Sequence, residues 1–346
     1  MIDPDVLLVV RNLRTTFDTD GGLVKAVDGI SFEIRRGELL AVVGESGSGK
    51  SVTALSIMSL LPSPPATITA DELSWKGEDL LEARPERLRQ VRGGEIAMIF
   101  QDPLTALNPV QTVGRQVAEM ARIHQDASKK VAWKQAVEML GLVGIPQPER
   151  RAEMHPHEFS GGMRQRAMIA MAIMCNPDLL IADEPTTALD VTVQAQVLEV
   201  LMQIKDEIDS AIMLITHDLG VVAGLADRVM VMYAGREAEV GTAHEVFYET
   251  RHPYTLGLLA SLPRLDDTGD ENLLPIRGAP PSLIDVPPGC PFHPRCDHSN
   301  GRERCRTEVP AFRVPDGVDH PAACHFAEEL ANVDLKELRE EEVSPA

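Results

Sequence analysis

Gly44-Glu-Ser-Gly-Ser-Gly-Lys-Ser51 carries the strongest structural signal in this chain. It follows the apolar run 38–43, which is typical of a strand buried on both faces. Residues 51–61 then place apolar side chains at helical spacing as far as Pro62, so a helix is expected there. A glycine-rich loop between a buried strand and a helix turns backbone N–H groups toward phosphate oxygens. The pattern therefore predicts a phosphate-binding loop.

The side chains of this loop have separate expected roles. Lys50 reaches the β- and γ-phosphates of a nucleotide, and the Ser51 hydroxyl ligates Mg²⁺. The helix that begins near Ser51 directs the positive end of its dipole at the same phosphates. The residues expected to contact the nucleotide are Gly44, Ser46, Gly47, Ser48, Gly49, Lys50, Ser51 and Val52.

A second apolar run, 179–182, ends in two carboxylates, Asp183 and Glu184. A carboxylate at the end of a strand can hold Mg²⁺ through water, and a second one can polarise an attacking water molecule. We therefore expect Asp183 to be a magnesium ligand and Glu184 to be catalytic. A strand that ends in Asp-Glu is also a common loop start, so this interpretation depends on the phosphate loop being present as well.

Strands and helices alternate along much of the chain. Strands are expected at 29–34, 212–215 and 228–233. Helices are expected at 164–174 and 191–208. This alternation predicts an α/β fold with a mainly parallel sheet that is covered on both faces.

Two parts of the chain depart from this alternation. Residues 102–164 show helical periodicity interrupted by Gly, Pro and Asn, which predicts a mainly helical insertion. After about residue 250 the composition shifts toward Pro, Gly and Cys. We thus divide the chain into a nucleotide-binding domain, 1–250, and a C-terminal extension, 251–346, whose acidic tail 328–342 is expected to be solvated.

A third motif, Phe159-Ser-Gly-Gly-Met163, precedes an apolar helix. Ser160 is a residue type that caps helices, and Gly161 and Gly162 leave backbone N–H groups bare for an anion. The order of phosphate loop, Ser-Gly-Gly element and Asp-Glu strand resembles the ATP-binding cassette family. The resemblance implies a P-loop NTPase core, an antiparallel β subdomain at the N-terminus, and ATP and Mg²⁺ as cofactors.

The resemblance covers about residues 6–247 and extends to four further positions. These are Gln101 in the glutamine loop, with an implied catalytic and magnesium-binding role, and Asp190 in the aspartate loop, with an implied nucleotide-binding role. The other two are the switch histidine His217, with an implied catalytic role, and Phe17, which would stack on adenine. The family's commonest signature has Leu and Gln where this chain has Phe159 and Met163. Since the serine hydroxyl and the glycine N–H groups make the phosphate contacts, we expect the difference to tune activity rather than abolish it.

Motifs in the C-terminal extension resemble one branch of this family. His252-Pro-Tyr-Thr255 and Gly289-Cys-Pro-Phe-His-Pro-Arg-Cys296 resemble the extension on ATPase subunits of oligopeptide, dipeptide and nickel importers. The implied protein is a peripheral ATPase on the cytoplasmic face of the inner membrane that drives import of di- or oligopeptides, with nickel as an alternative. The implied partners are a second, related cassette in a head-to-tail dimer, two transmembrane permease subunits and an extracytoplasmic peptide-binding protein.

Four of the five cysteines, Cys290, Cys296, Cys305 and Cys324, lie in this extension. Residues 1–10 have no basic residue ahead of their short apolar stretch and are not expected to be a secretory signal, so such clustering favours a metal site over a disulfide framework. Four thiolates suit either a [4Fe-4S] cluster or tetrahedral zinc, and the spacing does not choose between them. The resemblance favours the iron–sulfur cluster, while zinc or metal-free thiols stay open.

The net charge of the chain helps to distinguish between the remaining classes of function. The chain has 33 Lys and Arg against 53 Asp and Glu, a formal net charge of −20, which disfavours nucleic acid as a partner. This argues against the rival interpretation of a soluble cassette that acts on nucleic acid or ribosomes. A nucleotide switch that scarcely hydrolyses ATP is disfavoured because Glu184 and His217 are both present. No run reaches the roughly 18 apolar residues of a membrane-spanning helix.

Overall fold

The computed structural model describes residues 3, 5–187, 189–262 and 275–330, which form two compact units. The first unit comprises Glu33–Leu39, Leu73–Ile215 and the described residues up to Val9. The second comprises Val10–Phe32, Leu40–Glu72 and the described residues from Thr216 onward. Most of the predicted acidic tail lies after residue 330, outside the described residues.

Parallel strands form the core of the first unit. They are β7 (Ile96–Ile99), β8 (Leu179–Asp183) and β9 (Ala211–Thr216), with β8 between the other two. Every residue of the three strands is buried, as expected when both faces of a sheet are covered. The mainly parallel sheet predicted from the sequence is confirmed.

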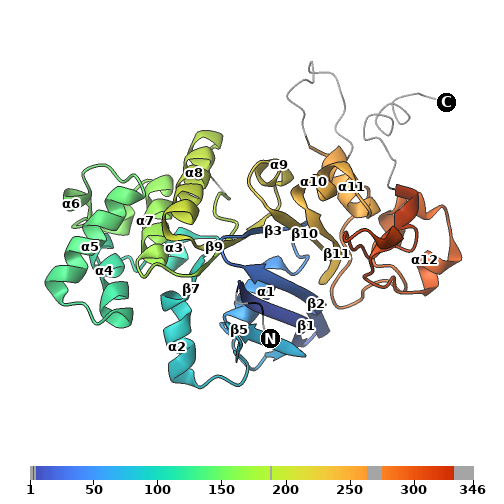
Figure 1. Cartoon of the computed structure of the whole chain (residues 1–346), viewed down its shortest axis with the longest axis horizontal. Helices are drawn as coiled ribbons and strands as arrows, with labels where there is room; N and C mark the ends of the chain where they lie inside the picture. The colour runs from blue at the N-terminus through green and yellow to red at the C-terminus, as the bar shows by residue number, and fades with distance from the viewer. Residues whose placement is uncertain (1–2, 4, 188, 263–274, 331–346) are drawn as a thin grey trace, which may run out of the picture. The chain divides into compact units, whose positions relative to one another are not determined.

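The predicted insertion is helical. In Figure 1, α4 (Val113–His124), α5 (Lys129–Leu142) and α7 (Gly161–Ile173) lie together, and all three contact one another. The insertion also holds α3 (Pro103–Ala106), α6 (Pro148–Arg151) and the 3₁₀ turn η1 (Pro156–Glu158). The unit is completed by β5 (Glu72–Trp75), β6 (Glu78–Asp79), α2 (Pro85–Gly94) and α8 (Val191–Ile208).

The second unit holds antiparallel β-structure from the N-terminal part of the chain. Strand β1 (Val6–Thr19) neighbours β2 (Gly22–Arg35) and pairs antiparallel with β4 (Ala66–Thr69). Strand β3 (Leu39–Val43) pairs in parallel with β10 (Arg228–Tyr233), which pairs antiparallel with β11 (Arg236–Thr242). The helices are α1 (Lys50–Ile57), α9 (Leu219–Val222), α10 (Ala243–Tyr248), α11 (Pro253–Ala260) and α12 (Glu303–Thr307). Short 3₁₀ turns are η2 (His293–Arg295), η3 (Asp297–Ser299), η4 (Pro315–Gly317) and η5 (Ala327–Leu330).

Part of the C-terminal extension is attached to β11. The Val240 N–H donates to the Pro321 carbonyl at 3.0 Å, and the Ala323 N–H donates to the Ala238 carbonyl at 2.8 Å. Beside this pairing, His320 Nε2 lies 2.8 Å from Glu239 Oε1, and both side chains are fully buried. Residues 320–323 therefore continue the sheet next to β11.

The phosphate loop lies between β3 and α1, where the backbone is crowded. A Cβ on Gly44 would lie 2.3 Å from the Met232 carbonyl oxygen, and one on Gly49 would lie 2.3 Å from the Ala26 carbonyl oxygen. Both glycines also have positive φ angles, 150° and 103°. The predicted helix 51–61 is wrong at its end: α1 stops at Ile57, because Ser59 turns into the left-handed conformation before Pro62.

We expect Gly44→Ala to lower the free energy of unfolding by about 2 kcal/mol or more, because the methyl group meets a backbone carbonyl that cannot turn away. Gly224→Ala is the matched control, since nothing lies within 4 Å of a Cβ built there. Its free energy of unfolding should stay within about 0.5 kcal/mol of the parent. Urea titrations of the parent and the two variants measure the difference, and equal effects of the two changes would contradict the crowding around Gly44.

Candidate nucleotide site and a thiol-lined cavity

The phosphate loop closes around the ammonium group of Lys50. This side chain is 4% exposed, and its Nζ donates to the carbonyl oxygens of Gly44, at 2.7 Å, and Glu45, at 3.0 Å. Helix α1 has Gly49 at its N-cap and no side chain that caps it. The N–H groups of the first helical turn are therefore not capped by a side chain, and N–H groups at such a helix N-terminus can bind an anion.

The carboxyl end of β8 holds Glu184 in a defined position. Its backbone is left-handed, with φ 46°, and its N–H donates to the Ile215 carbonyl at 2.9 Å. Gln101 Nε2 donates to Glu184 Oε2 at 3.0 Å, and Thr187 Oγ1 donates to the same oxygen at 2.8 Å. A positive φ angle is uncommon for a residue other than glycine, and such backbone conformations cluster at active sites.

Parallel register explains why Gln101 and Glu184 meet. Ile99 of β7 pairs with Ala182 of β8, so the residues that follow the two strands emerge at the same end. Asp183 closes β8 and is 5% exposed. The structure thus brings together two of the three predicted catalytic residues. Thr187, the second donor to Glu184, was not among the residues predicted from the sequence.

The Ser-Gly-Gly element begins α7 as expected. The Ser160 hydroxyl accepts a hydrogen bond from the Met163 N–H at 3.3 Å, and a Cβ on Gly161 would meet nothing within 4 Å. Gly162 packs against Val193 of α8, whose side chain lies 2.7 Å from the position of a Cβ. Asp190 caps the same helix by accepting from the Val193 N–H at 3.0 Å. Ser160 is therefore a helix cap, and of the two glycines Gly161 is open to solvent while Gly162 is packed against α8.

Two further predicted site residues, His217 and Phe17, lie in the second unit. His217 follows β9 and is exposed. Phe17 is half-buried in β1, where it pairs with Ala66 of β4. The switch role of His217 and the adenine-stacking role of Phe17 stay predictions.

Glu45, the second residue of the phosphate loop, has partners that the sequence analysis missed. Its carboxylate accepts two hydrogen bonds from Arg295, at 2.6 and 2.9 Å. Its backbone N–H donates to the Tyr254 hydroxyl at 2.8 Å. Both partners lie in motifs of the extension, Tyr254 in 252–255 and Arg295 in 289–296, and the sequence contains no local signal that joins them to the loop.

The four cysteines of the extension line one cavity of about 100 Å³. None is in a disulfide, and burial raises the pKa of all four thiols, to about 12 for Cys296 and Cys324. Neighbouring thiols raise the pKa of Cys296 further. The Phe326 N–H lies 3.4 Å from the Cys324 sulfur. In the part of the chain that the structure describes, no three His, Cys, Asp or Glu side chains are grouped so that they could hold a metal ion.

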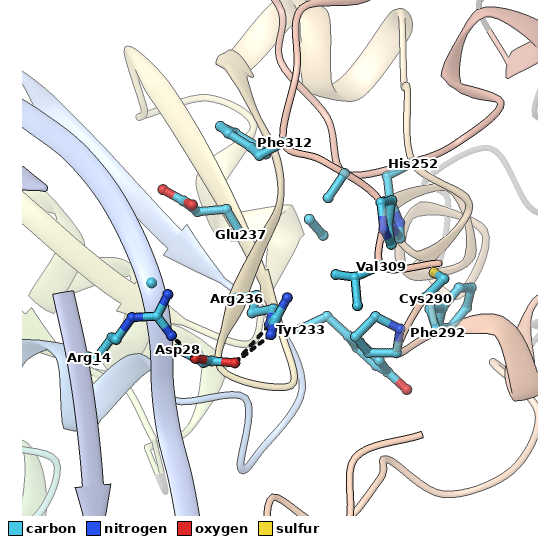
Figure 2. Close-up of a pocket in the computed structure, with 15 residues that line it drawn as sticks. Arg14, Asp28, Tyr233, Arg236, Glu237, His252, Cys290, Phe292, Val309 and Phe312 are labelled. Carbon is cyan, nitrogen blue, oxygen red and sulfur yellow. Dashed lines mark hydrogen bonds and ion pairs between the residues drawn. The ribbon is translucent and has the colours of Figure 1, made fainter. Parts of the chain in front are cut away.

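A larger cavity, of about 220 Å³, shares His252, Cys290 and Phe292 with the thiol-lined one (Figure 2). On its other side Asp28 forms ion pairs with both Arg14 and Arg236, as the dashed lines in Figure 2 show. Asp28 therefore balances one of the two positive charges, and the three side chains together carry a formal charge of +1.

Comparison with known proteins identifies the chain. The family described as ABC transporter matches residues 27–187, and the family described as oligopeptide/dipeptide transporter, C-terminal region, matches residues 238–305. A dimeric ATP-binding cassette solved in a post-hydrolysis state with ADP and Pi matches with a TM-score of 0.60 and 25% identity, over 68% of this chain and 99% of that one. The P-loop NTPase fold expected from the motifs is thereby confirmed.

Curated relatives agree with this assignment. The dipeptide transport ATP-binding protein DppD of Bacillus subtilis is 57% identical over 84% of this chain and 86% of its own length. The oligopeptide transport ATP-binding protein OppD of Escherichia coli is 51% identical over 90% of this chain and 91% of its own length. The chain therefore belongs to the ABC transporter family and is an ABC-type ATPase. Among the described residues, no helix has the length and apolar character to span a bilayer.

The buried carboxyl group of Glu237, which lines the larger cavity, is expected to make the free energy of unfolding depend on pH. Burial raises its pKa to about 7, opposed by the Ser31 N–H that donates to it at 2.6 Å. Because the folded-state pKa lies above the ordinary value of 4.5, the charged carboxylate opposes folding. The cost grows as the pH rises from about 4.5 to about 7 and reaches about 3 kcal/mol above that range.

The test is the change Glu237→Gln, which keeps an acceptor for Ser31 and removes the charge. Urea unfolding should show that its gain in stability over the parent is larger at pH 8 than at pH 5, by about 2 kcal/mol. Glu119→Gln, at an exposed position on α4, is the control and should show no such pH-dependent gain. A pH-independent effect of the Glu237 change would rule out the charge cost.

Proposed function

We propose that this chain is the ATP-hydrolysing subunit of a membrane importer for di- or oligopeptides. The observation that carries the hydrolytic part is the Glu184 carboxylate, which Gln101 and Thr187 hold at the end of β8. The peptide part is supported by the oligopeptide/dipeptide transporter region at residues 238–305 and by the names of the relatives DppD and OppD. These names also favour peptide over nickel, and a net charge of −20 disfavours nucleic acid.

In the proposed reaction Lys50 and the N–H groups of the phosphate loop bind the triphosphate. Ser51, Asp183 and Gln101 would hold Mg²⁺, which supplies positive charge against the phosphate oxygens. Glu184 accepts the proton of the attacking water, while the amide of Gln101 keeps its carboxylate oriented. His217 donates a hydrogen bond toward the transferred phosphoryl group.

The catalytic site would be completed by a second cassette. The exposed Ser160, with Gly161 and Gly162 at the start of α7, would close on nucleotide held by the phosphate loop of a partner, in a head-to-tail dimer. The dimeric state of the cassette solved with ADP and Pi supports this arrangement. We propose that the partner cassette is a related, non-identical chain.

The dimer would lie on the cytoplasmic face of the inner membrane, against two permease subunits served by an extracytoplasmic peptide-binding protein. Residues 1–250 would form the motor domain and residues 251–346 the extension. The names of the relatives, which describe transport ATP-binding proteins, support a place in such an importer.

We further propose that Cys290, Cys296, Cys305 and Cys324 hold a [4Fe-4S] cluster. The proposal is supported by their shared cavity and by backbone N–H groups that donate to three of the four sulfurs, a feature that tunes iron–sulfur sites. Because the described side chains are not grouped as a metal site, the four sulfurs would have to draw together to hold the cluster. The cluster would supply a structural cross-link between segments of the extension. Zinc is the alternative.

Glu184→Gln should leave ATP binding within about threefold of the parent and reduce turnover by at least about a hundredfold, because only the proton acceptor is lost. Steady-state phosphate release and equilibrium nucleotide binding measure the two quantities. Glu138→Gln, on the exposed face of α5, is the matched control with expected parental turnover. Full-rate hydrolysis by the Glu184 variant would overturn the assignment of the base.

Anaerobically purified protein should be brown, with broad absorbance near 400 nm and about four iron atoms per chain. Replacing Cys296 by Ser should abolish the colour. Replacing Cys175 by Ser should not, since Cys175 lies outside the cavity lining. Colourless protein that contains one zinc per chain would replace the cluster with the zinc alternative.

A further inference from the structure

Arg295 is the residue before Cys296, and its guanidinium contacts the phosphate loop at Glu45. It donates to both oxygens of Glu45, at 2.6 and 2.9 Å, and its Nε donates to the Arg277 carbonyl at 2.9 Å. Its side chain is 5% exposed. A two-pronged pair with an almost buried arginine is the strong form of the arginine–carboxylate interaction.

Aromatic rings hold Arg295 in this position. Nη1 lies 3.3 Å from the Tyr233 hydroxyl, and the guanidinium carbon lies 5.9 Å from the centroids of the Tyr233 and Phe292 rings. Tyr233 and Tyr254 also contact each other, with centroids 4.6 Å apart. The arginine therefore has little freedom to leave Glu45.

Every polar group of Glu45 has a partner in this arrangement. Arg295 binds its carboxylate, Tyr254 accepts from its N–H, and its carbonyl oxygen accepts from Lys50 Nζ and from the Ser48 N–H. The carboxylate would otherwise place a negative charge on a loop that has to accept phosphate. Arg295 thus neutralises that charge and fixes the first turn of the loop.

We propose that Arg295 is a positioning residue for nucleotide binding, which acts through Glu45 on the phosphate loop. The proposal rests on the proposed ATPase function. Because Arg295 directly precedes Cys296, the same contact links the thiol-lined cavity to the phosphate loop through one peptide bond. The extension would therefore set the affinity of the cassette for ATP.

The test is equilibrium binding of a fluorescent ATP analogue with Mg²⁺ to the full chain, together with the KM and kcat of hydrolysis. Arg295→Met should raise the Kd and the KM about tenfold and leave kcat within about twofold. In the Glu45→Gln background the same change should alter the Kd less than about threefold, because the charge that needs neutralising is gone. Arg313→Met is the matched control, since Arg313 pairs with Glu328 in the same extension, and should bind as the parent does.

Two results would overturn the proposal. One is a parental Kd for Arg295→Met, and the other is an equal loss in both Glu45 backgrounds, which would indicate a general structural role. If the variant does not fold, as judged by circular dichroism, Arg295→Lys decides: an increase of about threefold in Kd supports the proposal, and an unchanged Kd overturns it. Failure of the parent chain itself to bind the analogue would instead contradict the proposed ATPase function.

Discussion

The close approach of the phosphate loop to two backbone carbonyls constrains the nucleotide-binding part of the second unit. Gly44 lies against the Met232 carbonyl and Gly49 against that of Ala26, with room at each place for a hydrogen atom only. In the same loop the carbonyl oxygens of Gly44 and Glu45 accept hydrogen bonds from Lys50 Nζ. A loop packed this tightly keeps its shape before nucleotide arrives, so little conformational entropy is lost on binding.

The phosphate loop and the Asp-Glu strand could be placed from the sequence because their motifs are local. The phosphate loop and the Asp-Glu strand each combine a short pattern with an apolar run, and both lie where those patterns place them. Parallel pairing of β7 and β8 then brings Gln101 to Glu184. A reader of the sequence could name both residues, but their contact needs the strand register.

Contacts between distant segments were not predictable in the same way. Tyr254 is 209 residues from Glu45, and Arg295 is 250 residues from it. No periodicity or spacing records such a pairing, since it depends on how the extension packs against the phosphate loop. The end of α1 was missed for a local reason, the left-handed turn at Ser59, which is a conformation that serine seldom adopts.

The pairing of residues 320–323 with β11 has a practical meaning for anyone who shortens this chain. Cutting before residue 320 would strip β11 of the hydrogen bonds that Val240 and Ala323 make there. The exposed N–H and C=O groups would form an unpaired strand edge. Strands of other molecules can pair with such an edge, which is a known route to aggregation. It would also leave the carboxylate of Glu239 buried without His320. A chain cut before residue 320 would thus be a less soluble protein, and studies in solution should keep residues 320–323.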